Sequence, residues 1–252
     1  MSIKCIKHTN CDPNIAAQLK NRLSKSPHTN LEVHLHIDHI ILIQHNTTLQ
    51  PLKLSMVDSK ATYFHQSIRS TQPLLKAIGK TICTEKGLII DATAGFGQDS
   101  FIMASHGLEV ISIEQNPIIH AILECLVAML IQKKPHIKWK VLYGKSEHWL
   151  KHICSKKQPN AIYLDPFFHK PKKSLPKNAM QWLQELATKD TLSAEELFQR
   201  TLHQSIEKIV VKRDIKAPYL CNLFPNAGSI TQKSSRFDCY FRSQTTQNLK
   251  GG

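Results

Sequence analysis

The chain has 252 residues, of which 41% are hydrophobic, enough for one large α/β domain or for a domain of about 190 residues with an appendage. No apolar run approaches the roughly 20 residues of a membrane span, and no signal peptide opens the chain, so we expect a cytoplasmic protein. The 33 Lys and Arg against 19 Asp and Glu give a formal net charge of +14, which indicates a polyanionic partner, usually nucleic acid.

Residues 1–58 are interpreted as a small α/β unit, separate from residues 59–252. A short helix is predicted over residues 14–23. Apolar and polar residues alternate over residues 31–44, which predicts a half-exposed strand, and residues 52–56 are expected to pair back with it.

This predicted strand contains His34-x-His36-x-Asp38-His39, which has the spacing of a dinuclear zinc motif of the metallo-β-lactamase kind. In that family the motif lies in a loop and small residues follow it, whereas bulky aliphatic residues surround it here. We therefore interpret the histidines as the solvent-exposed face of a strand, and a zinc hydrolase is kept as an alternative function.

The remainder of the chain alternates between apolar strands and amphipathic helices. Strands are predicted at residues 88–90, 110–113, 139–143, 161–164 and 209–211, with a closing hairpin at 229–231 and 237–241. Helices are predicted at residues 70–81, 99–105, 118–132, 180–187 and 194–205. Such alternation predicts an α/β fold with a mostly parallel sheet and helices on both faces.

The central motif is the turn after the first of these strands, Asp91-Ala-Thr-Ala-Gly-Phe-Gly-Gln-Asp99. Gly95 and Gly97 are expected because a Cβ would stand where a ligand approaches the backbone at the strand's carboxyl end. Ser100 breaks the dinucleotide fingerprint, and no P-loop lysine follows. A second acid, Glu114, ends the next strand and suits the two donor hydroxyls of a ribose. This arrangement resembles the S-adenosylmethionine site of the class I methyltransferases.

Another candidate site residue is Asp165, in Asp165-Pro-Phe-Phe168, at the end of the fourth strand. The stretch resembles the (Asp/Asn)-Pro-Pro-(Tyr/Phe) motif of methyltransferases that modify exocyclic amines. A carboxylate there can accept an N–H bond and raise the electron density on the amine, while Phe167 or Phe168 stacks on the extruded base. The lysine-rich stretch that follows predicts phosphate contacts from Lys170, Lys172 and Lys173, joined by Lys212 and Arg213 at the end of the fifth strand.

Further motifs recur in order along the chain: Glu114-Gln-Asn-Pro, Tyr163-Leu-Asp-Pro-Phe-Phe, Lys172-Lys-Ser, Val210-Val-Lys-Arg and Arg236-Phe-Asp-x-Tyr. With them the sequence is similar to the ribosomal RNA small subunit methyltransferase J family over about residues 57–241. The resemblance implies a Rossmann-like class I fold, S-adenosylmethionine as cofactor and no metal. It also implies methyl transfer to N2 of a guanosine in 16S rRNA, with 16S rRNA or the small ribosomal subunit as partner.

By that resemblance, the residues that would bind the cofactor are Gln98, Asp99, Glu114, Gln115, Lys145, Ser146 and Asp165, together with Asp91, Gly95 and Gly97 of the turn. The predicted catalytic residues are Asp165, Phe167 and Phe168. The family often has Arg where Gln98 stands and Ser where Lys145 stands. Alternatives are a methyltransferase of the same fold acting on a tRNA guanine or a DNA adenine amine, and a non-catalytic RNA-binding module with a relic nucleotide pocket.

Overall fold

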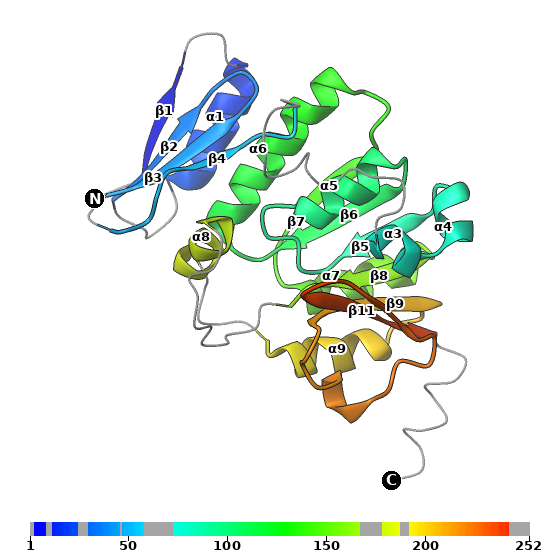
Figure 1. Cartoon of the computed structure of the whole chain (residues 1–252). Coiled ribbons are helices and arrows are strands. Elements are labelled where there is room, and N and C mark those ends of the chain that lie inside the picture. The colour runs from blue at the N-terminus through cyan, green and yellow to red at the C-terminus, as the bar shows by residue number, and fades with distance from the viewer. Residues whose placement is uncertain are drawn as a thin grey trace.

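Two β-sheets organise the chain in its computed structural model (Figure 1). The structure describes residues 3–8, 12–24, 30–45, 47–57, 73–166, 178–186 and 192–241. Within these ranges, no helix combines the length and the apolar character that crossing a membrane would require.

The N-terminal sheet has four strands in the order β1-β2-β3-β4, accompanied by one helix. Its elements are β1 (Lys4–Lys7), α1 (Pro13–Leu23), β2 (Leu31–Leu35), β3 (Ile40–Gln44) and β4 (Leu52–Leu54). The predicted helix and the pairing of β4 with β3 are confirmed. The prediction of one continuous strand over residues 31–44 is wrong: β2 and β3 form an antiparallel hairpin, because the chain turns back where the His36 N–H donates to the His39 carbonyl at 2.9 Å.

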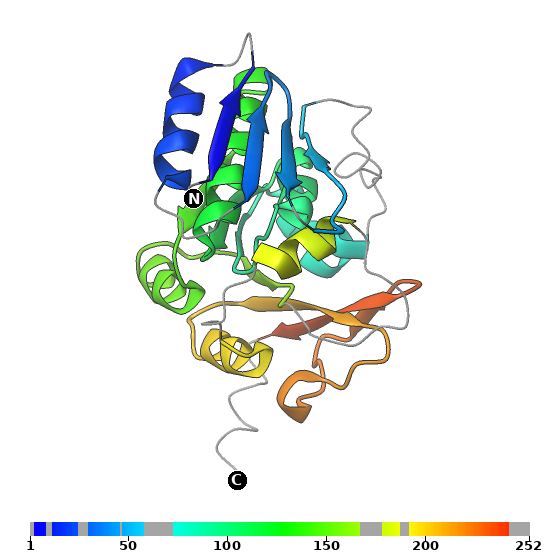
Figure 2. The ribbon, with the colours of Figure 1, turned by 90° about the vertical axis from the view of Figure 1, so that its left-hand side faces the viewer.

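Helix α1 attaches this unit to the rest of the chain. Asp12 caps α1 by accepting the N–H groups of Asn14 and Ile15, and the apolar face of the helix packs on the long helix α6 (Pro117–Lys133). An ion pair of 2.7 Å between Arg22 and Glu124 joins the two helices at their exposed edge. Figure 2 shows the N-terminal strands beside α6, and one hydrophobic core is continuous across both parts. The domain boundary near residue 58 stays a prediction, since residues 58–72 lie outside the described ranges.

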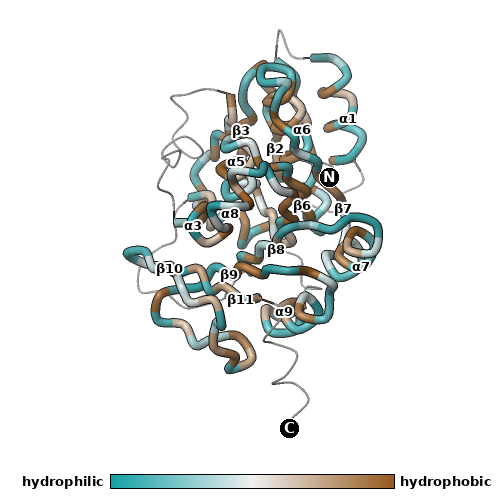
Figure 3. The backbone as a smooth tube through the Cα atoms, turned by 90° about the vertical axis from the view of Figure 1, so that its right-hand side faces the viewer, coloured by the Kyte–Doolittle hydropathy of each residue, from teal (hydrophilic) through white to brown (hydrophobic). Residues whose placement is uncertain are grey.

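The main sheet has seven strands in the order β10-β11-β9-β8-β5-β6-β7. The strands are β5 (Leu88–Asp91), β6 (Glu109–Glu114), β7 (Trp139–Tyr143), β8 (Ala161–Leu164), β9 (Lys208–Asp214), β10 (Ser229–Thr231) and β11 (Ser235–Phe241). Strands β5 to β9 run parallel, and β11 is antiparallel to both β9 and β10. The predicted α/β class, the mostly parallel sheet and the closing hairpin are confirmed. Figure 3 shows strong hydrophobic colour at β6, inside this sheet.

Helices cover both faces of the main sheet, as predicted. They are α3 (Pro73–Ile78), α4 (Lys80–Thr84), α5 (Gln98–Ser105), α6, α7 (Ser146–Lys156), α8 (Asn178–Leu186) and α9 (Ala194–Leu202). Helices α3, α5 and α6 pack on one face, and α7 and α9 on the other. The predicted helix over residues 70–81 is divided at Gly79, whose φ is +113°. Helix α7 was not predicted, because only Leu150 and Ile153 are buried in it and Lys and His fill most of its surface.

The last strands are held by a buried ion pair that accounts for the Arg236-Phe-Asp motif. Arg236 Nε donates to Asp238 Oδ1 at 2.8 Å, and the Asp238 side chain is fully buried. The same guanidinium donates to the carbonyls of Asp214 and Ile215 and lies 4.6 Å from the centre of the Tyr219 ring. This motif therefore anchors β11 to the end of β9.

Helix α8 connects the two sheets. The Trp182 ring is fully buried, and its Nε1 donates to the Gln50 carbonyl of the N-terminal unit at 2.9 Å. Leu183, the next residue, lies against Gly95 of the main sheet. The Leu186 carbonyl accepts a hydrogen bond from the Asn116 amide at the start of α6. The N-terminal unit thus positions a helix that touches the glycine turn.

We expect Trp182→Phe to lower the free energy of unfolding by about 1–2 kcal/mol, because it leaves the Gln50 carbonyl without its donor and leaves part of the ring's volume empty. Denaturant unfolding would measure this. Trp149→Phe is the matched control, since it removes an indole bond to the Tyr143 carbonyl at an exposed position and should cost less. An equal cost for both variants would show that α8 is not a main attachment of the N-terminal unit.

Candidate active site

The candidate site lies where the parallel strands end. Strand β5 has β6 on one side and β8 on the other, so the chain's direction of crossover reverses there. In open α/β sheets, a crevice that takes ligands opens at this position, outside the carboxyl ends of the strands. The turn after β5, Glu114 at the end of β6 and Asp165 after β8 all lie at this edge.

The two glycines of the turn are required for different reasons. Gly95 has a φ of +53° and Gly97 a φ of +80°. Both values lie in the left-handed region, which residues with a Cβ rarely adopt. A Cβ on Gly97 would lie 2.5 Å from Leu123 Cδ1 and 3.0 Å from the Trp139 ring, whereas a Cβ on Gly95 would meet only Leu183 at 3.5 Å. The expectation that both glycines make room for a ligand is therefore corrected at Gly97, where close packing against α6 and β7 imposes the glycine.

A buried chain of hydrogen bonds supports the turn from below. Asp91 accepts the Thr93 N–H at 3.1 Å and the Ser100 hydroxyl at 2.5 Å. The Ser100 and Ser112 hydroxyls are 2.6 Å apart, and Trp139 Nε1 donates to Ser112 at 2.8 Å. Burial raises the pKa of the Asp91 carboxyl to about 7, although the bonds from Ser100 and Thr93 oppose this shift. Asp91 is only 1% exposed, and both of its carboxylate oxygens already accept hydrogen bonds. The prediction that it contacts the cofactor is therefore corrected: its side chain supports the turn instead.

Glu114 joins the glycine turn to the start of α6. Its Oε2 accepts the Gly95 N–H at 2.9 Å and its Oε1 accepts the Asn116 N–H at 2.7 Å. Burial raises the pKa of Glu114 to about 7, against the effect of these two bonds. An ionised carboxylate can accept about four hydrogen bonds, so acceptor capacity remains for ribose hydroxyls. Glu114 thus fixes the turn as well as offering oxygens to a ligand.

A cluster of two acids around one lysine lies beside the turn. Lys212 Nζ is 2.7 Å from Asp99 Oδ2 and 2.9 Å from Asp165 Oδ2, and the Tyr163 hydroxyl donates to Asp99 Oδ2 at 2.5 Å. Burial disfavours the charged form of Lys212, but Asp165 and Asp99 outweigh it and raise the pKa of the amine above its ordinary value. Lys212 was predicted to bind RNA, and this stays a prediction: the structure shows its ammonium paired with two carboxylates of the site.

Asp165 is the most accessible acid of this cluster. Its side chain is 38% exposed, compared with 15% for Asp99. Its backbone N–H donates to Thr93 Oγ1 at 2.6 Å, which ties the end of β8 to the glycine turn. Burial raises the pKa of the Asp165 carboxyl, and the attraction of Lys212 counteracts this shift. The chain therefore presents a carboxylate at the mouth of the site with one oxygen held by Lys212.

The remaining predicted residues fall into three groups. Gln98 opens α5, Gln115 follows Glu114, and Lys145 and Ser146 open α7, so all four lie at the same edge as the turn, and the Ser146 hydroxyl donates to the Ala92 carbonyl. Their contacts with a cofactor stay predictions, as do those of Gly95, Gly97, Asp99, Glu114 and Asp165. The second group, Phe167, Phe168, Lys170, Lys172 and Lys173, lies outside the described residues. The third is Arg213, which was predicted to bind RNA and is corrected: it is only 4% exposed and donates to the Pro218 carbonyl at 2.8 Å.

Sequence reasoning assigned no role in the site to Tyr163, Thr93 or Tyr143. Tyr163 and Thr93 hold Asp99 and Asp165, as described above. Tyr143 ends β7 opposite Glu114 in the strand register and is 51% exposed. Tyr143 could have been found from the sequence, because it is an aromatic residue at the end of a predicted strand. Thr93 and Tyr163 could not, because they acquire their roles only through contacts between strands.

The histidine-rich stretch of the N-terminal unit lies partly on β2 and partly in the turn that follows it. His34 lies on β2, while His36 and His39 flank the turn between β2 and β3, so only His34 is on a strand as predicted. The ring centres of His8 and His36 are 4.0 Å apart and those of His36 and His39 are 4.1 Å apart, both stacked nearly parallel. Among the residues that the structure describes, no three His, Cys, Asp or Glu side chains are grouped to hold a metal ion. The zinc hydrolase alternative has no support in this geometry.

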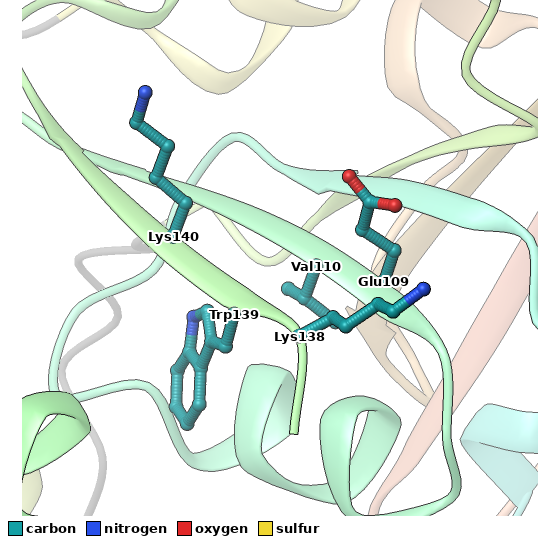
Figure 4. Close-up of a pocket in the computed structure, with 5 residues that line it drawn as sticks. All are labelled: Glu109, Val110, Lys138, Trp139 and Lys140. Carbon is teal, nitrogen blue, oxygen red and sulfur yellow. The ribbon is translucent and has the colours of Figure 1, made fainter. Parts of the chain in front are cut away.

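A shallow hollow lies at the opposite end of the main sheet. It is lined by Glu109, Val110, Lys138, Trp139 and Lys140, at the beginnings of β6 and β7 (Figure 4). Because ligands of this sheet architecture bind at the carboxyl ends of the strands, the hollow is not the candidate active site.

Comparison with known proteins agrees with this geometry. Residues 16–242 match the family described as "Putative SAM-dependent methyltransferase". Ribosomal RNA small subunit methyltransferase J of Psychromonas ingrahamii is 34% identical over 69% of this chain and 70% of its own length. The enzyme of the same name from Photobacterium profundum is 32% identical over 68% of this chain and 71% of its own.

Among solved structures, the SAM-dependent methyltransferase NGO1261 of Neisseria gonorrhoeae aligns with a TM-score of 0.69 at 20% identity, covering 99% of this chain and 100% of that protein. The fold and the strand-end site thus define the class of Rossmann-like methyltransferases that use S-adenosylmethionine. Within that class, the chain belongs to the ribosomal RNA small subunit methyltransferase J family.

The side chains at the strand ends fit S-adenosylmethionine. The cofactor carries a sulfonium, an ammonium and a carboxylate, a net charge of +1. Asp99 and Asp165 with Lys212 carry a net charge of −1, which complements it. Glu114 retains acceptor capacity for the ribose, and the first N–H groups of α5 suit the carboxylate.

We expect Gly97→Ala to lower the free energy of unfolding by about 3 kcal/mol or more. The new methyl group would overlap Leu123, and the alanine would have to adopt a left-handed backbone conformation. Gly95→Ala, the matched variant, meets only the backbone penalty of about 1–2 kcal/mol. Denaturant unfolding of both proteins tests this difference. If both variants lose the same stability, packing against α6 is not what imposes Gly97.

Affinity for S-adenosylmethionine should increase roughly tenfold between about pH 6 and about pH 8, because the pKa of Glu114 is about 7 and protonation removes an acceptor for the ribose. Folding stability changes in the opposite direction: the raised pKa favours folding at low pH, and this contribution is lost as the pH rises through about 7. Calorimetric titration across this range measures the affinity. Glu114→Gln should flatten the profile, and an unchanged profile in that variant would remove Glu114 from the ribose site.

Proposed function

We propose that the chain transfers a methyl group from S-adenosylmethionine to the exocyclic N2 of a guanosine in 16S rRNA, within naked rRNA or the small ribosomal subunit. The names of the relatives support the rRNA substrate. The observation that carries the proposal is the accessible Asp165 carboxylate, held beside the glycine turn by Thr93 and Lys212. An rRNA substrate also implies a cytoplasmic enzyme.

Asp165 suits an exocyclic amine because of how its two oxygens are used. Oδ2 is held by Lys212, and no hydrogen bond to Oδ1 is found among the described residues. Oδ1 is therefore available to accept an N–H of the guanine amine and turn the nitrogen lone pair toward the methyl donor. The amine lone pair is delocalised into the ring, so orientation and increased electron density both assist its attack.

Charge develops on the amine as the reaction proceeds. When bound, S-adenosylmethionine would supply an electrophilic methyl group. As the amine nitrogen forms the N–C bond, the bond between sulfur and the methyl group breaks and its electrons stay on sulfur, so the nitrogen becomes positive. The Asp165 carboxylate stabilises that positive charge and is placed to accept the proton that the nitrogen then loses. Lys212 keeps the carboxylate in position, and Phe167 and Phe168 remain the predicted stacking partners of the base.

Mass mapping of methylated RNA tests the function. Purified protein and labelled S-adenosylmethionine are incubated with 16S rRNA, and separately with small subunits, from a strain that lacks the gene. We expect N2-methylguanosine at one position of 16S rRNA. Label that enters only tRNA or a DNA adenine in parallel reactions would replace this proposal with the same-fold alternative.

Asp165→Asn should lower turnover by roughly 10²–10³-fold at saturating S-adenosylmethionine, the range for losing one positioned electrostatic group. RNA affinity should change little, because the interaction strengthens mainly in the transition state. Glu85→Gln, an exposed acid before the start of β5, serves as the control and should retain wild-type turnover. Wild-type turnover in Asp165→Asn would exclude the carboxylate from the chemical step.

A further inference from the structure

The burial of Arg213 and the ion pairs of Lys212 raise the question of which surface charges meet the RNA. Between residues 133 and 157 the chain has eight lysines and one acid, Glu147. Five basic residues from this stretch, all exposed, form what we call the edge patch: Lys138, Lys140, His152, Lys156 and Lys157. The patch lies along β7, the strand that ends the main sheet on this side.

The alternation of side chains along a strand places Lys138, just before β7, and Lys140, within β7, on the same side of the sheet. Trp139 and Val141 pack into the core on the α6 side, whereas Leu142 packs on the α7 side. Lys138 and Lys140 share the parity of Leu142 and so project toward the α7 side. Figure 4 shows Trp139 and Lys140 pointing to opposite sides of β7.

Helix α7 turns its own basic residues toward the same edge. Trp149 Nε1 donates to the Tyr143 carbonyl at 2.9 Å, which shows the side of α7 that faces the end of β7. His152 and Lys156 follow Trp149 at i+3 and i+7, the spacing of one helix face. The His152 ring packs edge-on against Trp149, with ring centres 6.0 Å apart. The basic side chains of two elements therefore share one surface.

The edge patch has little acid to neutralise it. Lys157 lies 3.6 Å from Glu109, a partly exposed pair of small energetic value. Within the described ranges, Lys138, Lys140 and Lys156 form no ion pair with a carboxylate. Such a row of unneutralised lysines complements a polyanion, because binding releases the counterions of the phosphates.

The position of the patch connects it with the active site. It runs along β7 toward Tyr143, an aromatic residue that is 51% exposed and lies opposite Glu114 in the strand register. An exposed ring between a basic surface and a nucleotide site suits stacking of an unpaired base. We propose that the edge patch binds the phosphate backbone of the RNA substrate outside the active site. This rests on the proposed RNA substrate.

Lysines on an edge strand also prevent strands of other molecules from pairing there, which is the competing explanation of Lys138 and Lys140. That role does not involve His152 or Lys156 on α7. It also predicts a different behaviour: the variant without these lysines would aggregate and would bind RNA as the wild type does.

The test compares Lys138→Ala, Lys140→Ala and Lys156→Ala, combined, with the combined control Lys7→Ala, Lys20→Ala and Lys80→Ala, exposed lysines on β1, α1 and α4. Affinity for a 16S rRNA fragment is measured over a range of salt. We expect the edge variant to lose about 2–3 units of the slope of log K against log salt, close to one unit for each lost phosphate contact. The control should keep the wild-type slope. S-adenosylmethionine affinity and turnover at saturating RNA should stay unchanged in both, while the KM for RNA rises in the edge variant alone.

A second titration with polyuridylic acid separates this proposal from the proposed function. Loss of slope on both RNAs in the edge variant supports the patch even if the wild type fails to methylate 16S rRNA, a result that would overturn only the proposed function. A wild-type slope in the edge variant, or an equal loss in the control, would overturn the patch. Lys140→Glu alone should weaken binding further than Lys140→Ala, and equal binding by the two would also contradict it.

Discussion

The buried chain of hydrogen bonds from Asp91 through Ser100 and Ser112 to Trp139 is the constraint on which the site depends. It joins β5, α5, β6 and β7 below the glycine turn, where an unpaired polar group would be costly and a satisfied network specifies one arrangement. The turn held in this way presents the Gly95 N–H to Glu114. Glu114, which is predicted to bind the ribose, is thus fixed by the turn that this network supports.

Charge in the site is balanced from within the chain. Lys212 lies between Asp99 and Asp165, so these three groups together carry a net charge of −1, where two adjacent acids alone would repel each other. The lysine leaves Asp165 accessible while fixing one of its oxygens. This arrangement suits the cationic cofactor and leaves one Asp165 oxygen for the amine of the proposed substrate.

The described part of the N-terminal unit supports the site without supplying a residue to it. Trp182 of α8 is buried and bonded to the Gln50 carbonyl, and its neighbour Leu183 contacts Gly95. Arg22 and Glu124 add a second connection, between α1 and α6. Because the hydrophobic core is continuous across these contacts, loss of the N-terminal unit would expose the apolar side of α8 next to the glycine turn.

Sequence by itself determined the features that depend on neighbouring residues. Apolar runs located the strands, and the Gly95–Gly97 turn and the acids that end β6 and β8 located the edge of the sheet where ligands bind. Tertiary structure decided which of these polar residues face a ligand. Asp91 is enclosed by α5, Arg213 turns toward Pro218, and Lys212 pairs with two acids that lie 113 and 47 positions away in the sequence. A strand pattern shows that a side chain is polar, but its partners come from strands that are neighbours only in the folded sheet. Charge and burial at the site are therefore set by the order β9-β8-β5-β6, which no local stretch of sequence contains.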